Sequence, residues 1–529
     1  MSITGAPDGP PRSPVPVTLG RPKAATIRLH PTDDVVIAGY PLAPGQPLPD
    51  EGLTVGPAIP AGHKLATHRI AAGQLIRRYG QVIGVATADI EPGEHVHLQN
   101  LAMTDFDRDH APSADSRPTR YVDEPRTFQG IRRSDGRAAT RNYVGLISSV
   151  NCSATVVRAI ADAFRRDIHP ERLAAYPNVD GVVAITHDGG CAVDPQGEGL
   201  AVLRRTLRGY AAHPNFGAVL VIGLGCETNQ VGELVAGVDV PHGRPLVSFD
   251  IQATGGTRHT VARGIELIEQ MLPRVNDVRR EPVPLSELVV GLQCGGSDGY
   301  SGITANPALG AAVDLLVANG GTAILSETPE IYGAEHLLTR RARSPQVAQQ
   351  LLDRFTWWEE YATRMGAELN NNPSAGNKQG GLTTVLEKSL GGVTKGGTTD
   401  LMAVYEYAER VSEHGLVFMD TPGFDPVSAT GQVAGGATLI CFTTGRGSAY
   451  GCQPTPSLKL STNDALWQRQ AEDIDINCGP LVSGETTLAA LGTEIFEAMI
   501  RCASGVPSVS EKHGYGQNEF VPWQLSAVM

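Results

Sequence analysis

The stretch ELVVGLQCGGSDGYSGITANPALGAAVDLLV, residues 287–317, decides the fold class of this chain. In it an apolar run ends in a glycine-rich loop, and a segment with helical periodicity follows. The same order recurs in YVGLISSVNCSATVVRAIADAF, residues 143–164, and in GAVLVIGLGCETNQVGELV, residues 217–235. Repeated units of strand, loop and helix are typical of a parallel sheet covered by helices. We therefore predict an α/β protein.

The rest of the chain divides into regions of different composition. A length of 529 residues exceeds what one core usually supports, so two or three domains are expected. Residues 1–25 are rich in Pro and Gly and are predicted to be a disordered tail. Residues 26–104 alternate short apolar runs with turn residues, which favours a small β-rich domain. Residues 105–129 are charged and proline-bearing, which is typical of a linker.

Overall charge and hydropathy argue against two classes of partner. The net charge is −13, and the largest basic cluster is a short one around Arg132, so the sequence lacks the basic surface of a nucleic-acid-binding protein. No run of about 18 apolar residues predicts a membrane span, and the N-terminus lacks the features of a secretory signal. We expect a cytoplasmic protein that acts on a small molecule.

Four of the eight cysteines follow predicted strands, namely Cys152, Cys191, Cys226 and Cys294. Ligands of parallel sheets gather at the carboxyl ends of the strands, so this placement favours one shared site for the four thiols. Buried, unreactive thiols are the alternative.

The loop VGLQCGGSDGYSGITANPALG, residues 290–310, has the strongest features of a binding site. Its glycines allow close approach of the backbone to a ligand, and Ser297, Asp298 and Asn306 offer a hydroxyl, a carboxylate and an amide. A glycine-rich turn with a helix-capping Ser or Asp is the alternative.

Two other glycine-rich segments carry candidate contacts to a carboxylate. Arg446 lies between two glycines in CFTTGRGSAYG, residues 441–451, where a guanidinium could bind a carboxylate through two hydrogen bonds. Asn377 and Lys378 lie in NPSAGNKQGG, residues 372–381, and would add a second polar contact. A solvated loop for Arg446 and a plain linker for the other two are the alternatives.

Histidines and carboxylates supply further candidates. His95 and His97 form an H-x-H pair that a strand would direct to one face, and His63 lies in the same domain, so the group could bind a metal or an anion. Two exposed histidines on a half-buried strand are equally consistent with the pattern. Glu327 directly follows an apolar run and is a weaker candidate for a base or a cation ligand, because acidic residues also open helices.

Several of these segments resemble the altronate/galactarate dehydratase family. The resemblance is carried in chain order by AGHK, RYGQVIGVATADIEPGEHVHLQN, DGRAATRNY, GLGCE, QCGGSDGYSGITANPALG, NPSAGNK, GLTTVLEKSLG, TTGRG and DINCG. These motifs span nearly the whole chain beyond residue 30.

The resemblance implies a fold, an oligomeric state and a reaction. It implies a β-clip domain of the SAF type over residues 26–104, a linker, a middle α/β domain over residues 130–278 and a Rossmann-like catalytic domain over residues 279–529. The middle domain would form a homodimer. The reaction would be dehydration of a sugar acid to a 2-keto-3-deoxy acid with iron under reducing conditions.

From these observations we assign roles to individual residues. The predicted catalytic residues are His63, His97, His187, Lys378 and Arg446. The predicted substrate contacts are Ser297, Asp298, Asn306, Asn377 and Arg446. The predicted metal ligands are Cys152, Cys191, Cys226 and Cys294. The metal would be a single Fe²⁺, an iron–sulfur cluster, or Mn²⁺ or another divalent ion, because the sequence does not separate these options.

The sequence departs from the usual pattern of the family in two places, and these departures leave other activities open. The stretch HDGGCA, residues 187–192, differs from the usual HGTGCG-like stretch of the family, although His187 and Cys191 are kept. Residues 415–431 and 475–479 look closer to the sulfolactate sulfo-lyase branch, in which sulfite is the leaving group. A non-catalytic sugar-acid-binding protein is an alternative of another class. Hydride transfer is disfavoured, because GLGCE lacks the third glycine of a dinucleotide-binding loop.

Overall fold

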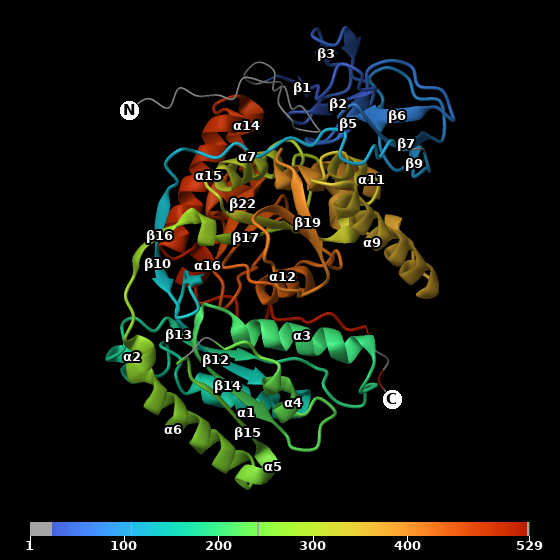
Figure 1. Cartoon of the computed structure of the whole chain (residues 1–529). Helices are drawn as coiled ribbons and strands as arrows, with labels where there is room; N and C mark the ends of the chain where they lie inside the picture. The colour runs from blue at the N-terminus through green and yellow to red at the C-terminus, as the bar shows by residue number, and fades with distance from the viewer. Residues whose placement is uncertain (1–23, 107, 241–242, 526–527, 529) are drawn as a thin grey trace.

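A computed structural model describes residues 24–106, 108–240, 243–525 and 528. It shows an N-terminal domain of short strands above one face of a large α/β domain, with a second α/β domain at the opposite side (Figure 1). The predicted α/β class with a small β-rich N-terminal domain is confirmed. The tail predicted for residues 1–25 lies almost entirely outside the described residues. None of the described helices is long and apolar enough to cross a membrane.

The N-terminal domain consists of three small antiparallel sheets, ordered β1-β2-β5-β8, β6-β7-β9 and β3-β4. Tyr79 and Gly80 join β6 to β7 with φ angles of 62° and 70°, which is the conformation that a tight two-residue hairpin requires. The strands are β1 (Thr26–Ile27), β2 (Val35–Ala38), β3 (Pro47–Leu48), β4 (Leu53–Thr54), β5 (Lys64–Ala66), β6 (Leu75–Arg78), β7 (Gln81–Ala86), β8 (His95–Val96) and β9 (Leu101–Ala102).

The predicted linker lies against the C-terminal domain over much of its length. Ser116 Oγ donates to Asp400 Oδ2 over 2.6 Å, and the ion pair between Arg340 and Asp115 spans 2.7 Å. Its last three residues differ from the prediction, because strand β10 (Thr127–Arg132) already begins at Thr127. Strand β10 pairs with β11 (Ala138–Ala139) and β16 (Glu281–Pro284) in an antiparallel sheet that the sequence did not reveal.

The middle domain is built on a four-stranded parallel sheet with the order β13-β12-β14-β15. Gly145 is required at the centre of β12, because a Cβ there would lie 2.9 Å from the ring of Phe216. The strands are β12 (Tyr143–Ser148), β13 (Gly181–Ile185), β14 (Phe216–Gly223) and β15 (Leu246–Asp250). The helices are α1 (Asn151–Asp162), α2 (Pro170–Ala174), α3 (Glu198–Ala212), α4 (Val231–Ala236), α5 (Ile251–Thr254) and α6 (Thr257–Asn276).

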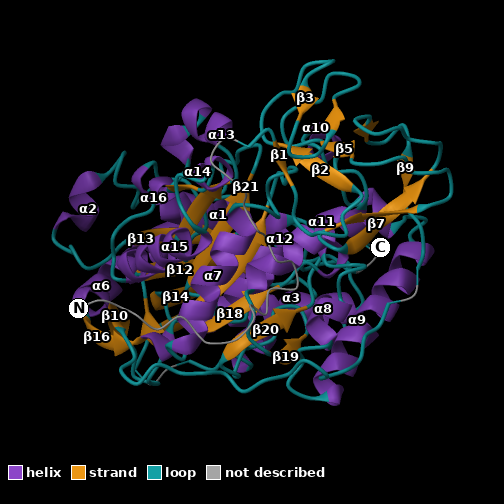
Figure 2. Ribbon diagram, turned by 90° about the horizontal axis from the view of Figure 1, so that it is seen from above, coloured by secondary structure: helices purple, strands orange, loops and turns teal. Residues whose placement is uncertain are grey.

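The C-terminal domain is built on a seven-stranded parallel sheet with the order β19-β20-β18-β17-β21-β22-β23, and helices lie on both of its faces (Figure 2). Five strands of this sheet are β17 (Val289–Cys294), β18 (Thr322–Leu325), β19 (Leu401–Tyr405), β20 (Gly415–Met419) and β21 (Leu439–Thr444). The other two are β22 (Ser457–Ser461) and β23 (Ile476–Asn477). The central strands are apolar and fully buried, as expected where helices cover both faces of a sheet.

Ten α-helices belong to the described part of this domain. They are α7 (Ala305–Ala318), α8 (His336–Thr339), α9 (Pro345–Arg364), α10 (Ala375–Gln379), α11 (Val385–Gly392), α12 (Asp425–Ala434), α13 (Asp464–Arg469), α14 (Pro480–Ser483), α15 (Leu488–Ala503) and α16 (Val509–Lys512). Helix α12 also packs on α3 of the middle domain, where a Cβ at Gly209 would lie 2.3 Å from the carbonyl oxygen of Ala434.

A buried ion triad joins the N-terminal domain to the C-terminal domain. Glu387 of α11 accepts hydrogen bonds from Lys64, at 2.9 Å, and from Arg78. All three side chains are inaccessible to solvent. Lys64 and Arg78 also donate to the carbonyl oxygens of Gly381 and Gly299 over 2.7 Å each. The two cations hold the pKa of Glu387 at about 2, although burial alone would raise it.

Replacing Glu387 by Ala should destabilise the protein strongly, because two buried cations would lose their anionic partner. The expected loss in the free energy of unfolding is about 3–5 kcal/mol. Chemical denaturation measures it, with Glu360→Ala on the exposed side of α9 as the control, for which a change below about 0.5 kcal/mol is expected.

The same ion triad predicts how stability depends on pH. Because the pKa of Glu387 is lower in the folded chain than in the unfolded chain, its contribution is present above the unfolded value and is lost as the pH falls towards 2. Wild type and Glu387→Gln should therefore converge in stability on acidification. A difference that stays constant down to pH 3 would contradict the assignment.

Candidate functional site

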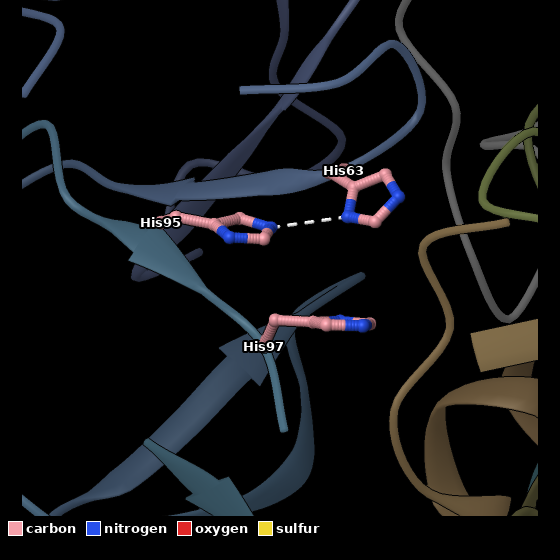
Figure 3. A group of neighbouring side chains, drawn as sticks. All are labelled: His63, His95 and His97. Atoms are coloured by element: carbon pink, nitrogen blue, oxygen red, sulfur yellow. Dashed lines mark hydrogen bonds between the residues drawn. The ribbon is translucent and has the colours of Figure 1, made fainter. Parts of the chain in front are cut away.

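Three histidines of the N-terminal domain face one another at its junction with the C-terminal domain (Figure 3). His63 precedes β5, His95 begins β8, and His97 follows β8. Their ring centroids are 5.0–5.3 Å apart, and one nitrogen of each ring lies within 4.8 Å of the others. The H-x-H pair does point to one face, as the sequence predicted, with the two rings stacked at 17°.

Hydrogen bonds fix the orientation of these rings. His63 Nε2 donates to the carbonyl oxygen of Gln379 over 3.1 Å, so in the neutral ring Nδ1 carries a lone pair that points towards His95 Nε2, 3.0 Å away. Asn100 holds the turn after β8 through bonds to the backbone of His95 and His97. His97 Nδ1 is buried without a hydrogen-bond partner.

The three imidazoles are held in the neutral form. Burial lowers the pKa of His63 and lowers the pKa values of His95 and His97 to about 4, with the neighbouring Lys64 adding to the effect. Neutral imidazole is the form that binds a metal ion.

Arg446 is linked to the histidine group through one residue, Gln379. Its Nη2 donates to the side-chain oxygen of Gln379 over 2.8 Å, while the backbone carbonyl of the same Gln379 receives the bond from His63. Arg446 is exposed. Gln379 therefore joins the guanidinium of Arg446 to His63, the member of the histidine group that it contacts.

The loop after β17 passes beneath Arg446. A Cβ at Gly296 would lie 3.2 Å from Arg446 Cβ, and one at Gly295 would lie 2.6 Å from Asp425 Oδ2, so both glycines allow close approach. The Ser297 hydroxyl is buried and has no hydrogen-bond partner.

At the start of this loop lies a buried cluster of ionisable groups, the Cys294 cluster. Its members come from the end of β17, the segment after β18, helix α11 with its 3₁₀ extension, and the start of α12. Its members are Cys294, Glu327, Glu330, Lys388, Lys395 and Asp425. Lys395 Nζ lies 2.7 Å from Cys294 Sγ and 3.2 Å from Glu327 Oε2. Lys388 Nζ lies 2.6 Å from Glu330 Oε1.

Charge balance keeps protons inside this cluster. Two lysines face three carboxyls and one thiol, so ionising all four acids would leave a net negative charge in a buried site. Burial and neighbouring carboxylates raise the pKa values of Glu327 and Asp425 well above the usual range, and burial raises the pKa of the Cys294 thiol. Glu327 also occupies the left-handed region, with φ of 69°, a conformation that the surrounding structure must impose.

Three of the predicted substrate contacts make hydrogen bonds within the fold. Both oxygens of Asp298 accept hydrogen bonds within the fold, Oδ1 from the hydroxyl of Thr462 over 3.0 Å and Oδ2 from Asn463 Nδ2 over 2.9 Å. Asn306 donates to Gly391 and accepts from Thr443. The Asn377 amide is similarly engaged, donating to the carbonyl of Ser297 and capping α10. Lys378 is half-buried on α10, beside Gln379.

The expectation that four cysteines share one site is wrong. Cys294 is buried in the Cys294 cluster at the carboxyl end of β17, the central strand of the seven-stranded sheet. Cys152, Cys191 and Cys226 are exposed in the middle domain, on a different sheet. His187 lies there too, apart from the other predicted catalytic residues, and both of its ring nitrogens are engaged with the backbone.

Sequence reasoning assigned no role to several residues of the site. Lys64 lies inside the motif AGHK, and Glu387 and Lys388 lie inside GLTTVLEKSLG. A Glu-Lys pair on a predicted helix is also typical of an exposed helix face, so the sequence did not mark these residues. Gln379 and Lys395 carry no signal in the sequence. Burial marks the four charged residues as part of a site, and Gln379 is marked by its hydrogen bonds to His63 and Arg446.

The fold defines a class of protein, a three-domain α/β protein with an N-terminal β-clip domain. The chain belongs to the D-galactarate/altronate dehydratase family. The SAF-domain model of the altronate/galactarate dehydratases matches residues 24–104. The second-domain and C-terminal-domain models of the family match residues 130–276 and 285–528.

Relatives of known name match over nearly the whole chain. Galactarate dehydratase (L-threo-forming) of Escherichia coli is 39% identical over 92% of this chain and 94% of its own length. Altronate dehydratase of Bacillus subtilis is 33% identical over 92% of this chain and 97% of its own length. The beta subunit of (2R)-sulfolactate sulfo-lyase of Chromohalobacter salexigens is 32% identical over 76% of this chain and 98% of its own length.

Solvent exposure predicts which of the eight cysteines react with a thiol reagent. In the folded, metal-free protein the three exposed thiols of Cys152, Cys191 and Cys226 should react rapidly with a thiol reagent, and the other five only after unfolding, because reaction requires access. A titration with Ellman's reagent before and after denaturation counts them. Rapid reaction of more than three thiols would contradict the burial described here.

Proposed function

We propose that this chain dehydrates a sugar acid, a galactarate- or altronate-like compound, to a 2-keto-3-deoxy acid. The observation that carries the proposal is the continuous contact from Arg446 through Gln379 to His63 and His95. It combines a cation for a carboxylate with ligands for a Lewis acid, which are the two groups that elimination next to a carboxylate needs. The family membership supports the same reaction.

Arg446 would bind the carboxylate of the substrate. It is the exposed cation at this junction, and its guanidinium suits a carboxylate through two hydrogen bonds. Lys378 directly precedes Gln379 on α10 and would add positive charge. The unpartnered hydroxyl of Ser297 is free to bind a hydroxyl of the sugar chain.

His63, His95 and His97 would hold a divalent metal ion, which we propose to be Fe²⁺. The fit rests on geometry, since three ring nitrogens lie within 4.8 Å of one another and His97 Nδ1 is buried without a partner. The carbonyl of Gln379 orients His63 as backbone carbonyls orient metal-binding histidines elsewhere. When bound, the ion supplies Lewis acidity to the departing hydroxyl.

The Cys294 cluster would handle the protons of the reaction. It holds acids with raised pKa values next to two lysines, and acid–base groups are most effective when their pKa lies near the working pH. Glu327 is the proposed base for the α-proton, because its Oε1 is buried without a hydrogen-bond partner.

We also propose that the enzyme is cytoplasmic and works as a homodimer. Eight unpaired cysteines suit a reducing compartment. The dimer follows from the family resemblance, and light scattering of the purified protein tests it.

The function is tested by supplying the anaerobic, Fe²⁺-loaded protein with galactarate, altronate and sulfolactate while following 2-keto-3-deoxy acid and sulfite. Dehydration of either sugar acid without sulfite is the expected result. Sulfite release from sulfolactate would assign the chain to sulfo-lyase chemistry. Tight binding without turnover of any compound would make it a binding protein.

Replacing Arg446 by Gln should lower kcat/KM by roughly 10- to 150-fold, the equivalent of a lost charge-assisted hydrogen bond of about 1.5–3 kcal/mol. Steady-state kinetics with the sugar acid measure this change. Arg469→Gln, on the exposed side of α13, is the matched control and should behave as wild type. Equal kinetics for both variants would remove Arg446 from the site.

Replacing Glu327 by Gln should change the pH profile of kcat/KM. If Glu327 is the base, activity of the wild type rises as the pH increases through its raised pKa, because the ionised form is then populated. The variant should lose this rise as well as most of its activity. A variant that keeps the wild-type pH profile would show that another group takes the proton.

Replacing His97 by Ala should weaken binding of a divalent ion at the junction by about 10-fold or more, since one of three ligands is lost. Co²⁺ serves as a spectroscopic probe of this site, titrated into metal-free protein. His68→Ala, an exposed histidine of the same domain, should bind Co²⁺ as wild type does. Unchanged Co²⁺ binding by His97→Ala would contradict the site.

A further inference from the structure

The middle domain carries a second group of candidate metal ligands, which the proposed mechanism does not use. Cys152, Cys191 and Cys226 are the exposed three of the eight cysteines, and the other five are buried. Each follows a different strand of one parallel sheet, namely β12, β13 and β14.

These three strands are neighbours in the sheet. Strand β12 lies between β13 and β14, and its last residues pair with theirs, Ile147 with Ile185 and Ser148 with Ile222. Because all three strands run in the same direction, their loops leave the sheet side by side.

Hydrogen bonds join the three loops to one another next to the cysteines. The backbone nitrogen of Asn151 donates to the carbonyl of Gly189 over 3.0 Å. Asn229 donates from its backbone to Gly190 over 2.9 Å and from its side chain to Ser149 over 2.8 Å. The three loops thus form one rigid rim, and each cysteine lies within three residues of these bonds.

Glycines set the direction in which two of the thiols leave the backbone. Gly190 and Gly225 precede Cys191 and Cys226 with φ angles of 101° and 122°. A Cβ at Gly190 would lie 2.5 Å from the carbonyl oxygen of Ser149, so no other residue fits there. The positions of the thiols are therefore imposed by the packed loops.

Hydrogen-bond donors lie close to two of the sulfurs. Cys152 is the second residue of α1 (Asn151–Asp162), in the first turn, where backbone N–H groups have no partner within the helix. Gln252 Nε2 donates to Cys226 Sγ over 3.3 Å. Hydrogen bonds to sulfur of this kind tune iron–sulfur sites.

The spacing of the three sulfur atoms indicates which kind of metal site they suit, a single ion or a cluster. Among the described residues, the groups of potential ligands that lie within 4.8 Å of one another do not include these three cysteines. A single tetrahedral ion binds each sulfur at about 2.3 Å, which would bring the sulfur atoms closer to one another than this limit. A cubane cluster spreads its thiolates over a wider rim, and a set made only of thiolates suits iron–sulfur chemistry.

We propose that Cys152, Cys191 and Cys226 hold a [4Fe–4S] cluster at the carboxyl edge of the middle-domain sheet. Three thiolates leave one iron of such a cluster without a protein ligand. This site is on a different sheet from Arg446 and does not depend on the substrate proposed above. An active enzyme without a cluster would refute this inference alone, and a cluster-bearing protein that dehydrates nothing would refute the proposed function alone.

The test is anaerobic reconstitution of the full-length protein with Fe³⁺, sulfide and dithiothreitol, which reduces part of the iron, followed by removal of unbound reagents. We expect about four acid-labile sulfides per chain, broad visible absorption, and an electron paramagnetic resonance signal after reduction or mild oxidation. Iron without labile sulfide, or neither, would overturn the proposal.

Variants assign the ligands. Cys152→Ala, Cys191→Ala and Cys226→Ala should each lose the labile sulfide and the resonance signal, and thermal unfolding of the metal-free proteins should be unchanged because the side chains are exposed. Cys478→Ala, at a buried cysteine, and His97→Ala should keep the cluster. Retention of the cluster in any of the three exposed-cysteine variants, or its loss in Cys478→Ala, would overturn the assignment.

Discussion

The buried triad of Lys64, Arg78 and Glu387 is the interaction on which the candidate site depends. Ion pairs in the interior are stable only when partners and hydrogen bonds are complete, and here two backbone carbonyls complete them. Because His63 directly precedes Lys64, the triad also fixes His63 against Gln379. The N-terminal domain is thus held with His63 against the residue that Arg446 also contacts, and the site exists only in the assembled molecule.

A second constraint is the direction of the parallel strands. Both α/β domains place their reactive side chains in loops after the strands, where backbone geometry is free to follow a ligand and helix N-termini supply partial positive charge. In the C-terminal domain these loops bury acids and lysines together, and the shortage of positive charge keeps protons on the acids. In the middle domain they bring thiols to the surface.

Local patterns were sufficient for much of the fold. Strand, loop and helix alternate within about thirty residues, a range over which hydrophobic periodicity is informative, so both parallel sheets were predictable. The antiparallel sheet of β10, β11 and β16 was not, because Gln129 and Pro282 pair across more than 150 positions and neither strand has a strong pattern of its own. The hydrogen bonds that Asp298 and Asn306 make within the fold were not predictable for a related reason. A polar residue after a strand looks the same whether its hydrogen bonds are completed by the protein or left for a ligand.

The sequence by itself determined the family, the β-rich domain followed by parallel sheets, and the position of Cys294, Arg446 and the H-x-H pair in loops or at strand ends. These follow from short-range order and from long matching motifs. Only the tertiary structure decided which of these groups meet. Cys294 is paired with Lys395 and separated from the other three thiols, and His63 reaches Gln379 across 316 positions. Proximity of this kind arises from the packing of whole domains, and the linear order of residues does not encode it in any local pattern.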